Sequence, residues 1–528
     1  MSSKCKKALL AIILAASILL RFGNLAWGEG YYFHPDENNI AQALLSLDQK
    51  GNPEFYAYGQ LPLFLSLSLA RGYNSFFHKQ AALNFHQAIF FLRFWSALTG
   101  VASVWVTYLL GKKLITPIAG LIAAAITAFL PGLIQAGHFG TTESLLSFLY
   151  LALAYSSLCF YQQGKAKDFI LIGFWGGLAL ATKISAALFG LIPLVTLLFL
   201  PKKPIRWLEI AAIILATTII FSPFLIINLS QTLNTLRYEI AIAQGETTVF
   251  YTRQFLGTFP FLFQIIKIFP FSLGWTVLSI SLLGIVIVFK KRKNKKKFFS
   301  WLIILIPTLT FFTYQGQLFT KWTRFMTPIL PIFSLLAAQA LIKIPKTIQY
   351  IVLALSLLPG VFFFDLVYAQ PDTRQQFSVW AKENLPEKSF ILSESGNITN
   401  LPLGKHNLEV VNFNFYRLEE KESQDQLCQL LEKADYILIP SRRVFANHFQ
   451  NKFPNTANYY QKLFSEQLGF SKLKEFSPNN RLPLVNFYYY KTETRAEETW
   501  TVFDHPTIRL YQKIKPYSTQ EYQRLIFE

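Results

Sequence analysis

The first 368 residues alternate between long apolar blocks and short polar or basic stretches. The first block runs from Ala8 to Leu20 and directly follows three lysines. A helix that crosses a bilayer needs about 20 mostly apolar residues, and many blocks here approach that length. The pattern therefore predicts an α-helical polytopic membrane protein, and we interpret the first block as a retained helix because no small-residue cleavage site follows it.

Basic residues indicate which connections face the cytoplasm. The N-terminus is basic, and the densest cluster, "KKRKNKKK" at 290–297, lies between two apolar blocks. Threading the blocks under this rule gives about eleven spans, with the N-terminus inside and the C-terminus outside. We expect one span over 115–134, an interfacial or re-entrant helix over 58–70, and two short spans within 169–200 whose outer turn holds Lys183.

The composition changes at about Ala369, where charges become frequent and long apolar runs stop. Residues 420–434 have a helical pattern, whereas "FILSES", "YILIPS" and "LVNFYYY" resemble strands. We therefore divide the chain into a membrane domain, 1–368, and a soluble α/β or α+β domain, 369–528, outside the cytoplasm.

Composition supports this class. The chain is 52% hydrophobic and only 15% charged, and its net charge is +20. Because the densest basic cluster sits in a short loop between spans, the positive-inside rule explains it and nucleic acid is not expected as a partner. The three cysteines show no metal-binding spacing and no disulfide framework.

The predicted topology gathers polar side chains on the outer side of the membrane. They are His34, Asp36, Glu37, Arg93, His138, Glu143, Lys183, Lys321 and Arg324. Ionisable residues near membrane depth are costly and often functional. A carboxylate can take a proton from an acceptor, and cations can hold the phosphate of a lipid-linked donor. The alternatives are a solvated acid pair at a helix start and cations that snorkel to lipid headgroups.

Several segments resemble one known family, the GT-C glycosyltransferases that include protein O-mannosyltransferases and lipid A aminoarabinose transferases. The segments are "FHPDE" (33–37), "YGQLPLFL" (58–65), "LRFWSALTGVASVWVTYLLGKKL" (92–114), "GHFGTTESLLSFL" (137–149), "GGLALATKISA" (176–186), "TRFMTPILPIFSLLAA" (323–338) and "FDHPTIRLY" (503–511). The chain looks most similar to phospholipid-carrier-dependent members. The second acidic loop has Glu143 where the family usually has Asp.

The resemblance implies a GT-C fold, a polyprenyl-phosphate sugar donor, an inverting reaction and a catalytic Asp in the first outer loop, which corresponds to Asp36. We therefore predict a glycosyltransferase of the cell membrane that acts on a protein, lipid or polysaccharide acceptor. Asp36 is the expected general base and Glu37 supports it. The expected substrate-binding residues are His34, Arg93, His138, Glu143, Lys183 and Arg324.

Three points stay open. No cofactor is certain, and a divalent metal is left open because two histidines and acids on separate loops form a weak ligand set. A transporter or flippase for lipid-linked saccharides would also use buried charges, but it should show internal inverted repeats, and none is visible. A non-catalytic scaffold should tolerate the loss of Asp36.

Overall fold

The computed structural model describes residues 2–77, 82–200, 206–290, 292–396, 401, 403, 407–449, 451–479 and 483–528, so one residue of the 290–297 cluster lies outside it. The chain divides into two compact units. Unit 1 comprises Met1–Ala26, Asp36–Glu246 and Phe259–Phe364, and unit 2 comprises Trp27–Pro35, Thr247–Thr258 and Asp365–Glu528. Two short segments from the first half of the chain thus belong with the C-terminal residues.

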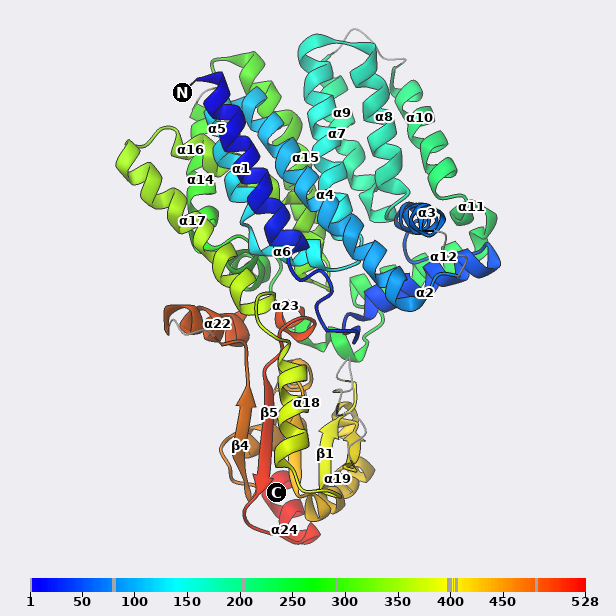
Figure 1. Cartoon of the computed structure of the whole chain (residues 1–528), viewed down its shortest axis with the longest axis vertical. Helices are drawn as coiled ribbons and strands as arrows, with labels where there is room; N and C mark the ends of the chain where they lie inside the picture. Colours follow the sequence, from blue (N-terminus) through cyan, green and yellow to red (C-terminus); the bar gives the residue numbers. More distant parts are fainter. Residues whose placement is uncertain are drawn as a thin grey trace. The chain divides into compact units, whose positions relative to one another are not determined.

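Unit 1 is helical, and most of its longer helices run side by side as a bundle, with α2 lying across one end (Figure 1). The helices are α1 (Ser3–Phe22), α2 (Pro35–Lys50), α3 (Leu61–Phe76), α4 (Phe85–Leu114), α5 (Pro117–Ala128), α6 (Pro131–His138), α7 (Glu143–Gln163), α8 (Ala166–Leu180), η1 (Ile184–Gly190), α9 (Leu191–Leu198), α10 (Arg206–Phe221), α11 (Phe224–Ile227), α12 (Leu229–Gln244), η3 (Gln264–Ile268), α13 (Phe269–Ser272), α14 (Trp275–Lys290), α15 (Lys295–Gln317), η4 (Thr323–Ile329), α16 (Leu330–Leu341) and α17 (Lys346–Val367).

Within the described residues, five helices are long and apolar enough to cross a membrane, or up to seven if each of two bent pairs is one span. The five are α4, α7, α15, Thr323–Leu341 and α17. Two apolar helices, Ile184–Leu198 and Trp207–Phe221, are shorter. The polytopic helical class is confirmed, whereas the total of about eleven spans stays a prediction.

The span expected over 115–134 is not a straight helix. α5 and α6 meet at 58°, and α6 begins at Pro131, which suits the first turn of a helix because proline has no N–H to leave unpaired. α6 then continues to His138, four residues beyond the predicted end of the span. The bend turns the end of α6 away from the axis of α5.

The break expected at Lys183 is present. α8 ends at Leu180, η1 begins at Ile184, and Lys183 lies between them with an extended backbone. The segment before α3 pairs with this turn, because the backbone N–H groups of Gly59 and Leu61 donate to the carbonyls of Thr182 and Ala181, both at 3.0 Å. The pairing brings Tyr58 beside Lys183.

Unit 2 is an α/β domain around a five-stranded mixed sheet in the order β2-β1-β3-β5-β4 (Figure 1). The strands are β1 (Phe390–Glu394), β2 (Glu409–Phe413), β3 (Tyr436–Ile439), β4 (Phe470–Phe476) and β5 (Ile508–Lys513). β1 pairs in parallel with β2 and β3, and β5 is antiparallel to β3 and β4. Along β1, Ile391 packs in one apolar core and Leu392 in another, as expected for a sheet buried on both faces.

Helices cover both faces of this sheet. α18 (Thr373–Asn384) contributes to the core that holds Ile391. α19 (Lys421–Lys433), α21 (Pro454–Phe464) and α24 (Thr519–Phe527) contribute to the other core. The remaining helices of the unit are η2 (Phe250–Phe255), η5 (Phe415–Arg417), α20 (Arg443–Ala446), α22 (Pro483–Arg495) and α23 (Thr499–Val502).

Two of the three predicted strands are confirmed as β1 and β3, and the predicted helix over 420–434 is confirmed as α19. The third strand prediction, for 484–490, is wrong because this segment lies in α22. Its aromatic residues favour strands, but Pro483 suits a helix start and the segment lacks the apolar–polar alternation of a half-buried strand.

Candidate active site

Glu37 and Arg93 form a buried ion pair between α2 and α4. Nε and Nη2 of Arg93 donate to the two Glu37 carboxylate oxygens at 2.7 and 2.8 Å. The backbone N–H of Gly140 donates to the same carboxylate at 2.7 Å, and Nη1 of Arg93 donates to the Leu25 carbonyl at 3.0 Å. The Glu37 side chain is 0% exposed. This arrangement ties the first turn of α2 to α4 and to the loop that precedes α7.

Asp36, the neighbour of Glu37, pairs with the guanidinium of Arg324 instead. Both side chains stay partly exposed, Asp36 at 22% and Arg324 at 28%. Arg324 belongs to η4, and its guanidinium lies 5.0 Å from the centre of the Trp322 ring. The apolar ring supports the cation without competing for its hydrogen bonds.

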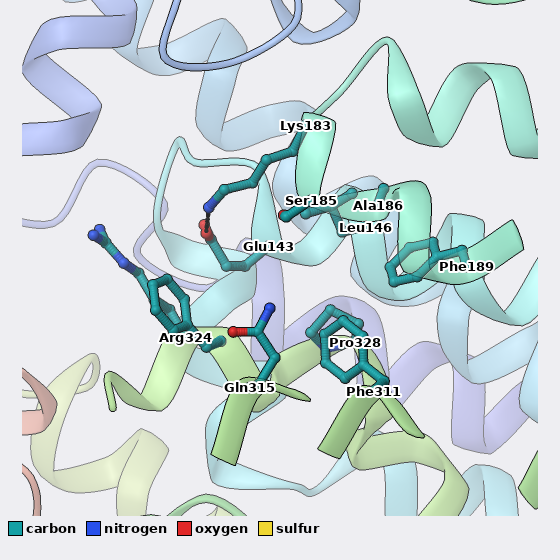
Figure 2. Close-up of a pocket in the computed structure, with 11 residues that line it drawn as sticks. Glu143, Leu146, Lys183, Ser185, Ala186, Phe189, Phe311, Gln315, Arg324 and Pro328 are labelled. Atoms are coloured by element: carbon teal, nitrogen blue, oxygen red, sulfur yellow. Dashed lines mark hydrogen bonds and ion pairs between the residues drawn. The ribbon is translucent and has the colours of Figure 1, made fainter. Parts of the chain in front are cut away.

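Lys183 and Glu143 form a third pair, at 3.4 Å between Nζ and Oε1. Figure 2 shows Lys183 reaching the Glu143 carboxylate from the turn before η1. The ammonium also lies 4.7 Å from the centre of the Tyr58 ring and 5.6 Å from that of Phe325. Glu143 occupies the first turn of α7, where the helix dipole favours a negative charge.

Arg324, Glu143 and Lys183 border a small pocket of unit 1 that is partly open to solvent (Figure 2). One part of its wall is polar and comes from Glu143, Lys183, Ser185, Gln315 and Arg324. The other part is apolar and comes from Leu146, Ala186, Phe189, Phe311, Phe325 and Pro328. The pocket therefore offers two cations and one carboxylate beside an apolar wall, and it can take a ligand with an anionic group and an uncharged group.

Gln315 is a pocket residue that the sequence analysis missed. It lies near the end of α15, is only 6% exposed, and its amide points toward Glu143 and Arg324 (Figure 2). Its Oε1 atom has no hydrogen-bond partner among the described residues. An unsatisfied buried amide is costly, so this atom suits a ligand that donates a hydrogen bond. The available signal was a glutamine at the end of an apolar run.

The two predicted histidines lie outside the pocket wall. His138 is buried, and its ring nitrogens lie 2.9 Å from the carbonyl oxygens of Ile134 and Gly23. His34 belongs to unit 2, where its ring packs 4.3 Å from the ring of Phe503. The Lys321 ammonium donates to the Phe319 carbonyl at 2.9 Å, and burial lowers the pKa of Lys321 to about 8.

The described residues contain no group of side chains that could bind a metal ion. No three His, Cys, Asp or Glu side chains come together there in a way that could hold an ion. Glu143 is paired with Lys183, and Asp36 is paired with Arg324.

Comparison with known proteins supports the resemblance. Residues 75–227, less than a third of the chain, match the family model of dolichyl-phosphate-mannose-protein mannosyltransferase. No curated protein sequence matches the chain.

Solved structures share the fold over nearly the whole chain. ArnT from Cupriavidus metallidurans bound to undecaprenyl phosphate is 11% identical, over 96% of this chain and 98% of that one, with a TM-score of 0.52. The oligosaccharyltransferase AglB from Archaeoglobus fulgidus, with an inhibitory peptide and a dolichol-phosphate, is 11% identical over 96% and 88%, with a TM-score of 0.54. An apo oligosaccharyltransferase from the same organism is 13% identical over 84% and 71%, with a TM-score of 0.53. The chain therefore has the fold of the GT-C glycosyltransferases, as its sequence motifs predicted.

Proposed function

We propose that the protein is an integral-membrane glycosyltransferase that uses a polyprenyl-phosphate sugar and works at the outer face of the cell membrane. The carrying observation is that Arg324 and Lys183, each paired with a carboxylate, border one pocket with an apolar wall. The ligands named for the similar structures, undecaprenyl phosphate and a dolichol-phosphate, combine an anionic phosphate with an apolar chain. The pocket offers partners for both parts.

In the proposed reaction, Asp36 is the general base. As the acceptor oxygen or nitrogen bonds to the anomeric carbon, its proton passes to the Asp36 carboxylate. The bond from the anomeric carbon to the phosphate oxygen breaks, and its electron pair stays on the phosphate. Attack opposite the departing phosphate inverts the anomeric centre.

Arg324 and Lys183 bind the phosphate in this proposal. The donor phosphodiester carries one negative charge, and the departing phosphate monoester gains a second one, so nearby cations favour the transition state over the bound donor. A phosphate at Arg324 would compete with Asp36 for the guanidinium and thereby free the carboxylate for proton transfer. Donor binding and activation of the base are then linked through one arginine.

Glu37 and Arg93 act indirectly in this proposal, by holding the first turn of α2 on which Asp36 lies. His138 would support the same region through its contact with the Gly23 carbonyl. Glu143 keeps Lys183 in place, and the Lys183 ammonium then interacts with both Glu143 and the donor phosphate. Protein, lipid and polysaccharide acceptors all fit this scheme.

The test is turnover of a panel of polyprenyl-phosphate sugars by the purified full-length protein. Released polyprenyl phosphate is measured by mass spectrometry, with membrane extract supplying acceptors. We expect release with at least one donor and its loss in Asp36→Asn. Asp48→Asn, at the other end of α2, is the matched control and should keep activity.

Two outcomes would refute the proposal. Full turnover by a well-folded Asp36→Asn protein would remove Asp36 as the base. Absence of release from every donor would favour a transporter of lipid-linked saccharides. Transporters commonly contain interrupted helices, and unit 1 has two bent helix pairs. A vesicle assay for movement of the labelled donor across the bilayer separates that case.

A further inference from the structure

The segment directly before Asp36 lacks regular secondary structure, yet it is buried at Trp27–Gly28 and again at Phe33–His34, whereas Glu29, Gly30 and Tyr31 between them are exposed. Trp27–Pro35 belongs to unit 2, and Trp27, Phe33 and His34 are at most 3% exposed. Its backbone turns sharply, since Gly28 has φ +86° and the Tyr31 N–H donates to the Gly28 carbonyl at 2.8 Å. A Cβ on Gly28 would lie 2.4 Å from the Tyr31 carbonyl oxygen, so this turn requires glycine. Without a helix or strand ladder, side-chain contacts must hold the segment in this conformation.

Those contacts come from two places in unit 2. The Arg374 guanidinium lies 3.4 Å from the centre of the Phe33 ring, and the amide of Gln375 donates to the Gly28 carbonyl at 3.1 Å. The Phe503 ring packs 4.3 Å from the His34 ring. The segment is thereby attached to the rest of unit 2 at two places, Gly28 and Phe33–His34.

The residues that make these contacts are themselves held firmly. Asp372 binds Arg374 through two hydrogen bonds, of 2.8 Å to Nε and 2.6 Å to Nη2. The Phe503 carbonyl accepts a third hydrogen bond from Arg374 at 2.9 Å. Arg374 is therefore oriented by a buried carboxylate and by the same residue that packs on His34.

The "FDHP" motif at 503–506 lies at the centre of this arrangement. Tyr368 donates to Asp504 at 2.7 Å, and the His505 ring contacts the same carboxylate. Thr373 donates to the Pro506 carbonyl at 2.8 Å. The motif thus fixes Phe503 and the start of α18 together. Polar networks of this kind define one conformation when their members are satisfied.

We propose that Phe503 and Arg374 are positioning residues for Asp36. They hold Phe33 and His34 in one conformation, and Asp36 follows this segment after a single residue, Pro35. Unit 2 then contributes to the reaction by fixing the segment 27–35, which leads into α2. This inference rests on the proposed function, in which Asp36 must be placed accurately to take a proton.

The test compares Phe503→Ala with Phe503→Tyr, which keeps the ring, and with Phe470→Ala. Phe470 is a fully buried phenylalanine of β4 in the same unit. Two properties of the full-length protein are measured: amide hydrogen exchange of the peptide that covers 27–35, and kcat and KM for the donor.

We expect Phe503→Ala to increase exchange in 27–35 and to lower kcat by up to about 100-fold, with KM little changed. Phe503→Tyr should restore both values, and Phe470→Ala should change neither. Unchanged exchange in Phe503→Ala, or increased exchange with normal kcat, would overturn the inference. If Phe470→Ala lowers kcat equally, the effect is general destabilisation and the inference is also wrong.

A second variant covers the case in which Phe503→Ala does not fold. Gln375→Ala removes only the hydrogen bond to Gly28 and should loosen the segment by a smaller amount in the same two assays. A wild-type protein that releases no polyprenyl phosphate would refute the proposed function. In that case the exchange measurement still decides whether Phe503 holds the segment.

Discussion

Asp36 and Glu37 are neighbours in the chain, yet their surroundings differ. The Glu37 carboxylate is fully buried and receives three hydrogen bonds from Arg93 and Gly140. Asp36 is partly exposed and its ion pair is with Arg324, at the edge of the pocket. Because the Glu37 carboxylate is fully buried and the Asp36 carboxylate is partly exposed, only Asp36 is within reach of an acceptor, and we propose proton transfer for Asp36 and support for Glu37.

Glu37→Gln keeps the shape of the side chain but leaves Arg93 buried without its countercharge. Removing one partner of a buried pair commonly costs about 3–5 kcal/mol, so we expect a clear fall in the thermal unfolding midpoint in detergent. Glu54→Gln is the control, because its pair with Lys50 is exposed and is worth about 1 kcal/mol or less. Equal midpoints for the two variants would show that the buried pair adds no stability.

Gln315→Met preserves the volume of the side chain and removes its amide. Because Oε1 of Gln315 has no partner among the described residues, the protein should keep its unfolding midpoint. The donor should bind more weakly, with a rise in KM of up to about 10-fold for one lost hydrogen bond. Gln264→Met tests specificity, since Gln264 is buried away from the pocket wall. A lower midpoint with unchanged KM would instead give Gln315 a structural role.

Glu498 predicts a pH dependence of stability in unit 2. Burial raises the pKa of Glu498 from 4.5 to about 7, against the opposing effect of Arg443. The stability that depends on this carboxyl group is therefore fully present below about pH 4.5, where the group is protonated in both states. It falls as the pH rises and is lost above about pH 7, where the group is ionised in the folded state as well. Glu498→Gln mimics the protonated form. Its unfolding midpoint relative to wild type should increase from pH 5 to pH 8, and a constant difference would contradict the assignment.

At the scale of elements, the sequence predicted helices better than their interruptions. The break at Lys183 was predictable because a lysine inside an apolar block conflicts with a single span. The bend between α5 and α6 was not predicted, although Pro131 marks a helix start there. Arg21 also binds the end of α5, where it donates to the carbonyls of Thr127 and Ala128 at 3.2 and 3.0 Å. These partners are more than a hundred positions away in the chain, so local periodicity carries no information about them.

The same reasoning applies to the site. From apolar blocks and lysines, the sequence grouped Asp36, Glu143, Lys183 and Arg324 together, and the structure brings these four residues into two ion pairs. The side of the membrane on which they lie stays a prediction. The sequence did not predict the pairs Asp36–Arg324 and Glu143–Lys183, because pairing depends on how distant helices pack. The error in 484–490 has a different origin, since aromatic content alone does not distinguish a strand from a helix.

The "YGQLP" segment needs a glycine at position 59 because its backbone passes very close to that of Ala181. A Cβ there would lie 2.0 Å from the Ala181 carbonyl oxygen, so Gly59→Ala must displace the segment from the turn that holds Lys183. We expect a lower kcat/KM for the donor, because Tyr58 and Lys183 would separate. Gly72→Ala in α3 is the matched control, since its added methyl group meets no atom within 4 Å. Equal activity of the two variants would show that the close approach is not required.

At the scale of the whole molecule, the proposed function depends on which side of the membrane each end of the chain occupies. A lipid-linked donor meets an external acceptor only if Asp36 and unit 2 lie outside the cytoplasm. The distribution of charge predicts this arrangement, because the basic N-terminus and the 290–297 cluster both favour the inside. The prediction concerns orientation alone and is independent of catalysis.

The native cysteines allow a direct measurement of this orientation. Cys5 is exposed near the start of α1, whereas Cys159 and Cys428 are buried. Asp425→Cys would place a new thiol on α19, where the Asp425 side chain is 53% exposed. In intact spheroplasts, a membrane-impermeant maleimide should label Asp425→Cys, and it should label Cys5 only after permeabilisation. A Cys5→Ser background identifies which thiol reacts. Labelling of Cys5 in intact spheroplasts, with residue 425 protected, would reverse the topology and place Asp36 in the cytoplasm, away from the proposed acceptors.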